Sequence, residues 1–358
     1  MSPLAEPAAQ AARVTWREPA REAAFGHWLS SITPRFGLDA ASLAPASADA
    51  SFRRYLRLQG REGSLVVMDA PPPLEDVRPF VHVAGLLAEA GVHAPRVLAA
   101  DEAAGFLLLT DMGTGLYLDA MRDGGPAEAD RLMRQALSSL VHWQQQVRAD
   151  TLPAFDAPRI HEELALFPTW CVQREHGITW TPQQQAAWQQ VCERIVASAV
   201  AQPAVAVHAD FMPRNLMLTA DDATKGPGIL DFQDAVRGAI TYDLASLLRD
   251  AFVSWPEEQQ LDWAVRWWEQ ARKAGLPVDA DFGEFWRALE WMGLQRHLRI
   301  LGVFCRLKHR DHKPRYAEDL PRFFGYATKV AMRYRPLAPL LPLLEPMSGA
   351  AVEAGFTF

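Results

Sequence analysis

Two short apolar segments each lead to side chains whose types and spacing could do chemistry together. The segment VAV (205–207) is followed by Asp210, and Asn215 stands five positions later. The segment GIL (228–230) leads to Asp231, sixteen positions after Asn215. A carboxylate and an amide oxygen suit Mg²⁺, and a second carboxylate can accept the proton of an attacking hydroxyl. The set therefore predicts Mg²⁺-dependent phosphoryl transfer.

The segments around these residues predict how they are brought together. LML (216–218) reads as a strand, the polar stretch DDATKGPG as a hairpin loop, and GIL as the returning strand. Two strands joined by a turn would bring Asn215 and Asp231 near each other, with Asp210 a few residues away. His208 is expected to be structural and to bond the loop backbone. The alternative is that these acidic residues only cap loops, which the paired pattern disfavours.

The N-terminal third predicts a small β-rich unit. A helix is expected near Arg21–Ile32, where Phe25, Trp28 and Leu29 have helical spacing. A run of small residues (40–51) precedes the first expected strand. The order strand, strand, helix, strand, strand predicts a small sheet with one helix packed against it. The strands are expected at 52–58, 64–70, 96–100 and 105–111, and the helix at 74–91, with Pro79 in its first turn and Gly91 at its end.

The rest of the chain is mainly helical. DMGTG (111–115) is a natural hinge, followed by helical patterns at 116–200 and 240–340 around a β-rich block at 204–234. We therefore predict an α+β fold with a small β-rich N-lobe and a larger, mainly helical C-lobe, a layout that holds a nucleotide between lobes. The expected parts are a tail (1–20), a nucleotide-covering N-lobe (21–111), a C-lobe with the catalytic loop and the acceptor pocket (112–345) and a second tail (346–358).

Composition narrows the class of protein. The 358 residues carry a net charge of −7, which gives no basis for binding nucleic acid or a membrane surface. The three cysteines form no CxxC pair and read as buried, reduced residues. No signal peptide and no apolar run of membrane-spanning length is present. We expect a monomeric, soluble, cytoplasmic protein whose partner is a small molecule.

Three motifs resemble the aminoglycoside phosphotransferase (APH) family of enzymes with a protein-kinase-like fold. They are HADFMPRN (208–215), ILDFQDA (229–235) and YDLASLLRD (242–250). The resemblance implies that Asp210 is the catalytic base and that Asn215 and Asp231 are the Mg²⁺ ligands. It also implies that Asp243, at a helix start, is a buried carboxylate bracing the catalytic loop. ATP and Mg²⁺ are the cofactors that the resemblance implies.

Within that family, further segments resemble the sugar 1-kinases of peptidoglycan recycling. They are RRYLRL, VVMDAPPPLEDVRPFV, GFLLLTDMG and the stretch at 296–316. This implies an alcohol-group phosphotransferase that acts on the anomeric hydroxyl of N-acetylmuramate and N-acetylglucosamine, toward UDP-N-acetylmuramate. The alternatives are a kinase of another small alcohol (choline, homoserine or an aminoglycoside) and a catalytically inactive nucleotide-binding protein. A protein kinase is disfavoured, because YDLASLLRD follows Asp231 by only eleven residues.

The nucleotide side departs from the usual kinase pattern. Met68 stands where an N-lobe lysine would pair the phosphates, so Arg53, Arg54 or Arg57 could supply that charge, or could simply form a solvated strand face. No G-x-G-x-x-G is present, so Ser51 and nearby backbone N–H groups would have to cover phosphate. The adenine is expected against the hinge, at Thr110, Asp111 and Met112.

The acceptor side is basic. Between Arg296 and Arg315 there are seven Lys/Arg residues, three histidines and one acidic residue. This argues against a polycationic aminoglycoside and fits an anionic or polar sugar, since arginine recognises carboxylates with two hydrogen bonds. A solvated helix face is the alternative. Arg306, His309 and Asp311 are the candidate pocket residues.

Overall fold

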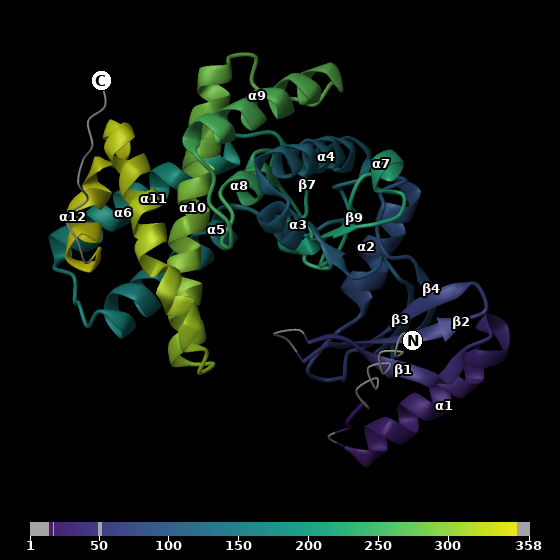
Figure 1. The fold of residues 1–358 in the computed structure, drawn as a ribbon. Helices are drawn as coiled ribbons and strands as arrows, with labels where there is room; N and C mark the ends of the chain where they lie inside the picture. Colours follow the sequence, from purple (N-terminus) through teal and green to yellow (C-terminus); the bar gives the residue numbers. More distant parts are fainter. Residues whose placement is uncertain (1–13, 17, 49–51, 349–358) are drawn as a thin grey trace, which may run out of the picture. The chain divides into compact units, whose positions relative to one another are not determined.

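The computed structural model describes residues 14–16, 18–48 and 52–348 and divides into two compact units (Figure 1). The first unit combines the chain up to Gly115 with Met217–Asp234, and the second contains Leu116–Leu216 and the chain from Ala235 onward. Residues 217–234, which the sequence assigned to the C-lobe, thus join the first unit. The functional division into lobes at 111/112 stays a prediction, and most of the two expected tails lies outside the described residues.

A five-stranded antiparallel sheet forms the centre of the first unit, in the order β1-β2-β3-β5-β4. The four predicted strands are present, and β1 is a fifth that the sequence did not predict. The unit also holds the predicted helix α2 and the hairpin region after β8. The elements are β1 (Asp39–Ala48), β2 (Arg54–Gly60), β3 (Gly63–Asp69), α2 (Arg78–Glu89), β4 (Val97–Asp101), β5 (Phe106–Thr110), β8 (Leu216–Leu218), α7 (Asp222–Lys225) and β9 (Gly228–Ile229).

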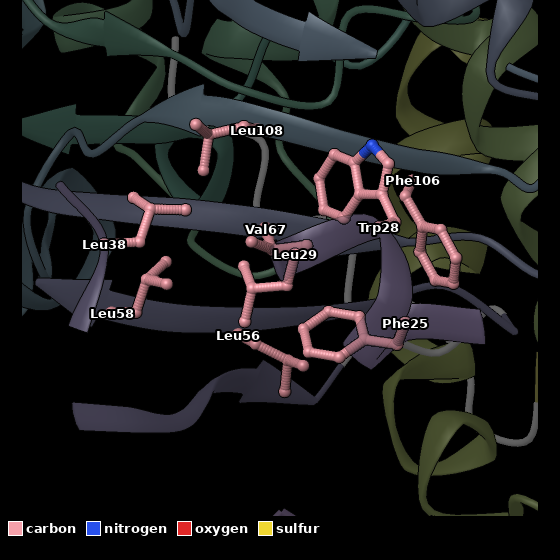
Figure 2. Packing of buried hydrophobic residues seen from close by; sticks show 9 residues of the cluster. All are labelled: Phe25, Trp28, Leu29, Leu38, Leu56, Leu58, Val67, Phe106 and Leu108. Atoms are coloured by element: carbon pink, nitrogen blue, oxygen red, sulfur yellow. The ribbon is translucent and has the colours of Figure 1, made fainter. Parts of the chain in front are cut away.

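Helix α1 (Pro19–Phe36) packs against this sheet through one apolar face. Phe25, Trp28 and Leu29 recur at helical spacing and are buried, as Figure 2 shows. Trp28 stacks on Phe106 of β5 with ring centroids 5.3 Å apart. The sequence predicted that one helix, the one between the second and third predicted strands, packs against the sheet. Helix α1 is an additional helix that packs there. The sheet side of the cluster comprises Leu56, Leu58, Val67, Phe106 and Leu108.

An ion-pair cluster joins α1 to the end of strand β3. The Asp69 carboxylate, 2% exposed, accepts hydrogen bonds from Arg21 Nε (2.9 Å) and Arg54 Nε (2.6 Å). The Arg54 guanidinium also lies 3.8 Å from the ring centre of Trp16. Because a buried carboxylate is costly unless it is paired, these contacts hold the helix in place on the sheet.

The second unit is mainly helical, as predicted (Figure 1). The long helix α10 packs against α8 and α11. Among the described residues, no helix is long and apolar enough to span a membrane. The elements are α3 (Tyr117–Asp123), α4 (Gly125–Gln146), α5 (Ala157–Leu164), a π-helix (Phe167–Glu175), α6 (Pro182–Val200), β7 (Ala204–Val207), β10 (Val236–Ala239), α8 (Tyr242–Leu248), α9 (Glu257–Lys273), α10 (Phe282–His309), α11 (Leu320–Arg333) and α12 (Leu341–Leu344).

Candidate active site

The loop that carries Asp210 begins where strand β7 ends. Strand β7 pairs antiparallel with β10, Val207 lying opposite Val236. The Asp243 carboxylate at the start of α8 accepts the backbone N–H of His208 at 2.7 Å and that of Ala209 at 3.0 Å. Ala209 has φ +78°, a conformation that side chains disfavour. A buried carboxylate thus fixes the backbone just before Asp210.

Burial dominates the electrostatics of Asp243, whose side chain is fully enclosed. It raises the pKa of Asp243 to about 7, while the N–H groups of His208 and Ala209 and the charge of Arg296 act in the opposite direction. The negative charge of Asp210 adds to the increase in pKa. The group is therefore held by hydrogen bonds that partly offset its loss of hydration.

Asp210 differs from its surroundings because it remains accessible to solvent. Its side chain is 37% exposed, while Asn215 is 7% exposed. The Asn215 Nδ2 atom donates to the Asp210 carbonyl oxygen at 2.9 Å, so its amide oxygen is the atom that a cation would use. The Asn215 side chain comes from a 3₁₀ turn, Pro213–Asn215. The turn and the hydrogen bond fix Asp210 and Asn215 relative to each other.

His208 is enclosed, as expected for a structural residue. Its side chain is 0% exposed, and its Nδ1 accepts the Asp210 backbone N–H at 3.3 Å. Its ring packs near Trp143 and Phe211, with centroid distances of 5.2 and 5.8 Å. These contacts place the imidazole where it supports the loop.

Arg296 of α10 is a neighbour of Asp210 that the sequence did not single out. Its Nη1 donates to the Ala209 carbonyl at 2.9 Å, and its Nη2 lies 3.8 Å from Asp210 Oδ1. No local signal marks Arg296, because it stands between the polar residues Gln295 and His297 in the sequence.

Asp231 lies in the first unit, two residues after strand β9. The backbone of Asp231 has φ +64°. Three non-glycine residues with positive φ are found among the described residues, and two of them, Ala209 and Asp231, lie in the motifs HADFMPRN and ILDFQDA. Such strained backbone is concentrated at functional sites. Gln233 Nε2 donates to Asp231 Oδ1 at 2.9 Å, and the buried ring of Phe232 packs on Phe80 with centroids 4.6 Å apart.

The approach of Asn215 to Asp231 stays a prediction. Strands β8 and β9 are neighbours in a small sheet of order β6-β8-β9, where β6 is Gly115–Leu116. Asn215 immediately precedes β8, and the predicted hairpin loop between the strands contains the short helix α7.

Each of the three arginines predicted for the nucleotide side lies near a carboxylate of its own unit. Arg54 is paired with Asp69, and Arg57 makes two hydrogen bonds to Asp111, at 2.6 and 2.9 Å. The Arg53 Nε atom lies 3.6 Å from the Glu75 carboxylate. Arg54 and Arg57 therefore already serve to neutralise carboxylates of their own unit.

The other nucleotide-side candidates occupy varied environments. Asp111 also accepts a hydrogen bond from Ser64 Oγ, and although burial opposes it, pairing with Arg57 and Ser64 lowers the pKa of Asp111. Met68 is fully buried, opposite Tyr55 and Leu107 in the sheet. Thr110 Oγ1 accepts the Arg96 N–H at 2.9 Å. Met112 is partly buried, and Ser51 lies outside the described residues.

Much of the basic stretch is matched by carboxylates. Lys308 and His309 both contact Glu175, each at 2.6 Å, and Asp311 is paired with its neighbour Arg310. Burial lowers the pKa of Arg306, whose Nε has no hydrogen-bond partner among the described residues. A pocket role for Arg306, His309 and Asp311 stays a prediction.

The donor types fit a magnesium ion better than a metal bound by a protein cage. Among the described residues, no group of three or more His, Cys, Asp or Glu side chains is arranged to hold a metal. Mg²⁺ is commonly held by one or two protein oxygens together with phosphates and water. Asn215 and Asp231 offer such oxygens.

Relatives of known name are similar to this chain over nearly its whole length. The model of the phosphotransferase enzyme family (APH) matches residues 42–296. A Pseudomonas aeruginosa protein named N-acetylmuramate/N-acetylglucosamine kinase is 48% identical, covering 90% of this chain and 96% of that protein. A Neisseria meningitidis protein of the same name is 45% identical, covering 94% and 99%.

Solved structures of kinases have the same fold at low sequence identity. A Plasmodium vivax ethanolamine kinase superposes with a TM-score of 0.57 at 10% identity, covering 91% of this chain and 88% of that one. The GDP complex of aminoglycoside 2'-phosphotransferase-IIIa gives 0.56 at 15% identity, covering 86% and 99%. The predicted α+β, protein-kinase-like fold is thereby confirmed. With the matching family model and these relatives, the chain belongs to the phosphotransferase enzyme family.

Proposed function

We propose that this protein is an ATP- and Mg²⁺-dependent sugar kinase that phosphorylates the anomeric hydroxyl of N-acetylmuramate and N-acetylglucosamine. The observation that carries the proposal is the accessible Asp210 carboxylate, held on a loop whose backbone is fixed by Asp243. The substrate class is supported by the relatives, which are 45–49% identical and named for these two sugars. The product would be a sugar 1-phosphate, an intermediate toward UDP-N-acetylmuramate in cell-wall recycling.

In the proposed mechanism Asp210 orients the anomeric hydroxyl and accepts its proton. The sugar oxygen forms a bond to the γ-phosphorus as the bond to the bridging oxygen of ATP breaks, and ADP leaves. Asn215 and Asp231 would hold the Mg²⁺ ion that neutralises charge on the phosphate oxygens. His208 and Asp243 act on the backbone and keep Asp210 in place. Positioning and electrostatics supply most of the rate, because loose phosphoryl transition states need little covalent help.

The nucleotide side of the proposal concerns the contacts to the phosphates and to the adenine. Arg53, Arg54 and Arg57 remain the three proposed candidates for contact with the phosphates. Thr110, Asp111 and Met112 remain the proposed adenine contacts. A reaction that consumes ATP implies the cytoplasm as the compartment.

Phosphorus NMR of the purified protein tests the proposal. The protein is incubated with Mg·ATP and, in separate tubes, N-acetylmuramate, N-acetylglucosamine and kanamycin. We expect a new phosphate resonance coupled to the anomeric proton in both amino-sugar tubes and none with kanamycin. Phosphorylated kanamycin would contradict the proposed acceptor class. ATP binding without any product would favour the inactive nucleotide-binding alternative.

A variant separates the role of Asp210 from general effects on the protein. Asp210→Asn should lower turnover by ~10²–10⁴, the loss expected on removal of a general base. Asp262→Asn is the control, because Asp262 is an exposed carboxylate on α9 that pairs with Arg266. Near-normal turnover of Asp210→Asn would refute the assignment of Asp210 as the base.

A further inference from the structure

We propose that Arg296 is a positioning residue, which fixes the Ala209 peptide and the Asp210 carboxylate in the orientation that phosphoryl transfer needs. The proposal rests on the proposed function for the role of Asp210. It adds a residue from a helix more than eighty positions further along the chain, in none of the motifs that carry the chemistry.

The guanidinium of Arg296 contacts two consecutive residues of the loop. Its Nη1 donates to the Ala209 carbonyl at 2.9 Å, and its Nη2 lies 3.8 Å from Asp210 Oδ1. A planar guanidinium is rigid, so the hydrogen bond that fixes it to the Ala209 carbonyl also places its positive charge beside the Asp210 carboxylate, at ion-pair distance. Lysine offers a single ammonium and cannot reproduce this arrangement.

Arg296 is itself held firmly in the fold. Its side chain is only 4% exposed, and its guanidinium lies 4.8 Å from the ring centre of the buried Tyr242. Such burial removes it from direct contact with a solvent-borne substrate, which is why we assign it a positioning role. The more accessible Asp210 is left to meet the sugar.

The hydrogen bond from Arg296 to the Ala209 carbonyl matters because the backbone of Ala209 is strained. Ala209 adopts φ +78°, a backbone conformation that residues with a Cβ atom disfavour. Its N–H is held by Asp243 and its carbonyl by Arg296, so both sides of the strained residue are fixed. Loss of Arg296 would leave the carbonyl without this donor and allow Ala209 to relax, which would turn Asp210 away from its position.

A competing explanation is that Arg296 only balances buried negative charge. The carboxylates of Asp243 and Asp250 are close enough for the arginine to lower their pKa values, against the larger effect of burial. A purely structural arginine would affect stability and leave the rate per folded molecule unchanged. The test must therefore measure turnover and loop order separately from the melting temperature.

The experiment compares Arg296→Ala, Arg296→Lys and the control Arg299→Ala. Arg299 lies one turn away on α10, where it pairs with Glu163 and is 29% exposed. We expect kcat for sugar phosphorylation to fall by about 10²-fold in Arg296→Ala, the loss typical of a 1 Å misplacement, with little change in the KM for ATP. Millimolar guanidinium should restore part of kcat in Arg296→Ala and have no such effect on wild type or Arg299→Ala. Arg296→Lys should retain an intermediate kcat.

Hydrogen exchange of the peptide 204–216 gives a second readout that requires no sugar turnover. We expect faster exchange of this peptide in Arg296→Ala and wild-type exchange in Arg299→Ala, with both variants folded by circular dichroism. Unchanged kcat and unchanged exchange in folded Arg296→Ala would overturn the positioning role. A wild-type protein that phosphorylates neither sugar, but whose loop loosens in Arg296→Ala, would refute the proposed function and leave the positioning role standing.

Discussion

Asp250 should make the stability of the protein fall as the pH rises from about 4 to about 6. Its carboxylate, just after α8, is 1% exposed. The N–H groups of Phe252 and Ala251 approach it, but neither oxygen has a partner of hydrogen-bond geometry among the described residues. Burial raises its pKa from 3.8 to about 6, despite the lowering effects of Arg296 and Arg322.

The sign follows from proton binding in the two states. Between pH 3.8 and about 6 the folded protein keeps a proton on Asp250 that the unfolded chain releases, so rising pH favours unfolding. A pKa change of this size corresponds to about 3 kcal/mol. Asp250→Asn removes the ionisation and keeps the shape of the side chain. Relative to wild type, the variant should therefore gain about 2.4 kcal/mol in free energy of unfolding between pH 4 and pH 7, because the unfolded carboxyl is already partly ionised at pH 4.

Urea unfolding followed by the fluorescence of the twelve tryptophans measures this difference. The curves are recorded for wild type and Asp250→Asn at pH 4, 5, 6 and 7. Asp262→Asn is the control, because Asp262 is an exposed residue paired with Arg266 on α9. If the difference between wild type and Asp250→Asn stays constant over this range, the argument from burial is refuted.

Three further changes test other parts of the structure. Asp243→Ala removes the acceptor of two backbone N–H groups, so turnover should fall by about 10²-fold as the loop shifts; steady-state kinetics checks this, and wild-type kcat would contradict the bracing role. Asp69→Asn leaves Arg21 and Arg54 without their carboxylate and should lower the free energy of unfolding by about 3 kcal/mol. Urea unfolding measures this loss, and Asp76→Asn, which removes the exposed pair with Arg78, is the control. Gly105→Ala places a methyl group 2.0 Å from the Ala70 carbonyl oxygen at φ +72°, whereas Gly91→Ala, at φ +68°, meets no atom within 4 Å. Thermal melting should therefore show the larger loss for Gly105→Ala, and equal losses would mean that strain and not the clash is responsible.

The fold was predictable where the chain alternates apolar and polar residues, forms a short apolar run, or repeats apolar residues at helical spacing. Strands β2, β3, β4 and β5 and helices α1 and α2 follow such patterns and were expected near their observed bounds. Strand β1 was not predicted, because its sequence, DAASLAPASA, is rich in alanine and includes a proline, both uncommon in strands. Its pairing with β2 supplies the hydrogen bonds that local propensity does not favour.

The site was predictable only where sequence neighbours act together. The carboxylates and the amide were found because short motifs carry them, and the bond from Asn215 to the Asp210 carbonyl lies within one motif. Arg296 was missed because its contact joins residues 87 positions apart. The basic stretch has an acidic partner that the sequence did not reveal, since Glu175, which contacts Lys308 and His309, is more than 130 positions away in sequence. Partners set by tertiary packing leave no local signature.

The discontinuity of the first unit also constrains how the chain is made. Its sheet region is complete at Gly115, yet Met217–Asp234 belongs to the same unit. Domains fold as units during synthesis, at about 5–20 residues per second. A ribosome must therefore extend the nascent chain by the whole of Leu116–Leu216 and the returning segment, on the order of ten seconds, before the first unit can close. A fragment ending at Gly115 would lack strand β9 and most of β8, which belong to the same unit.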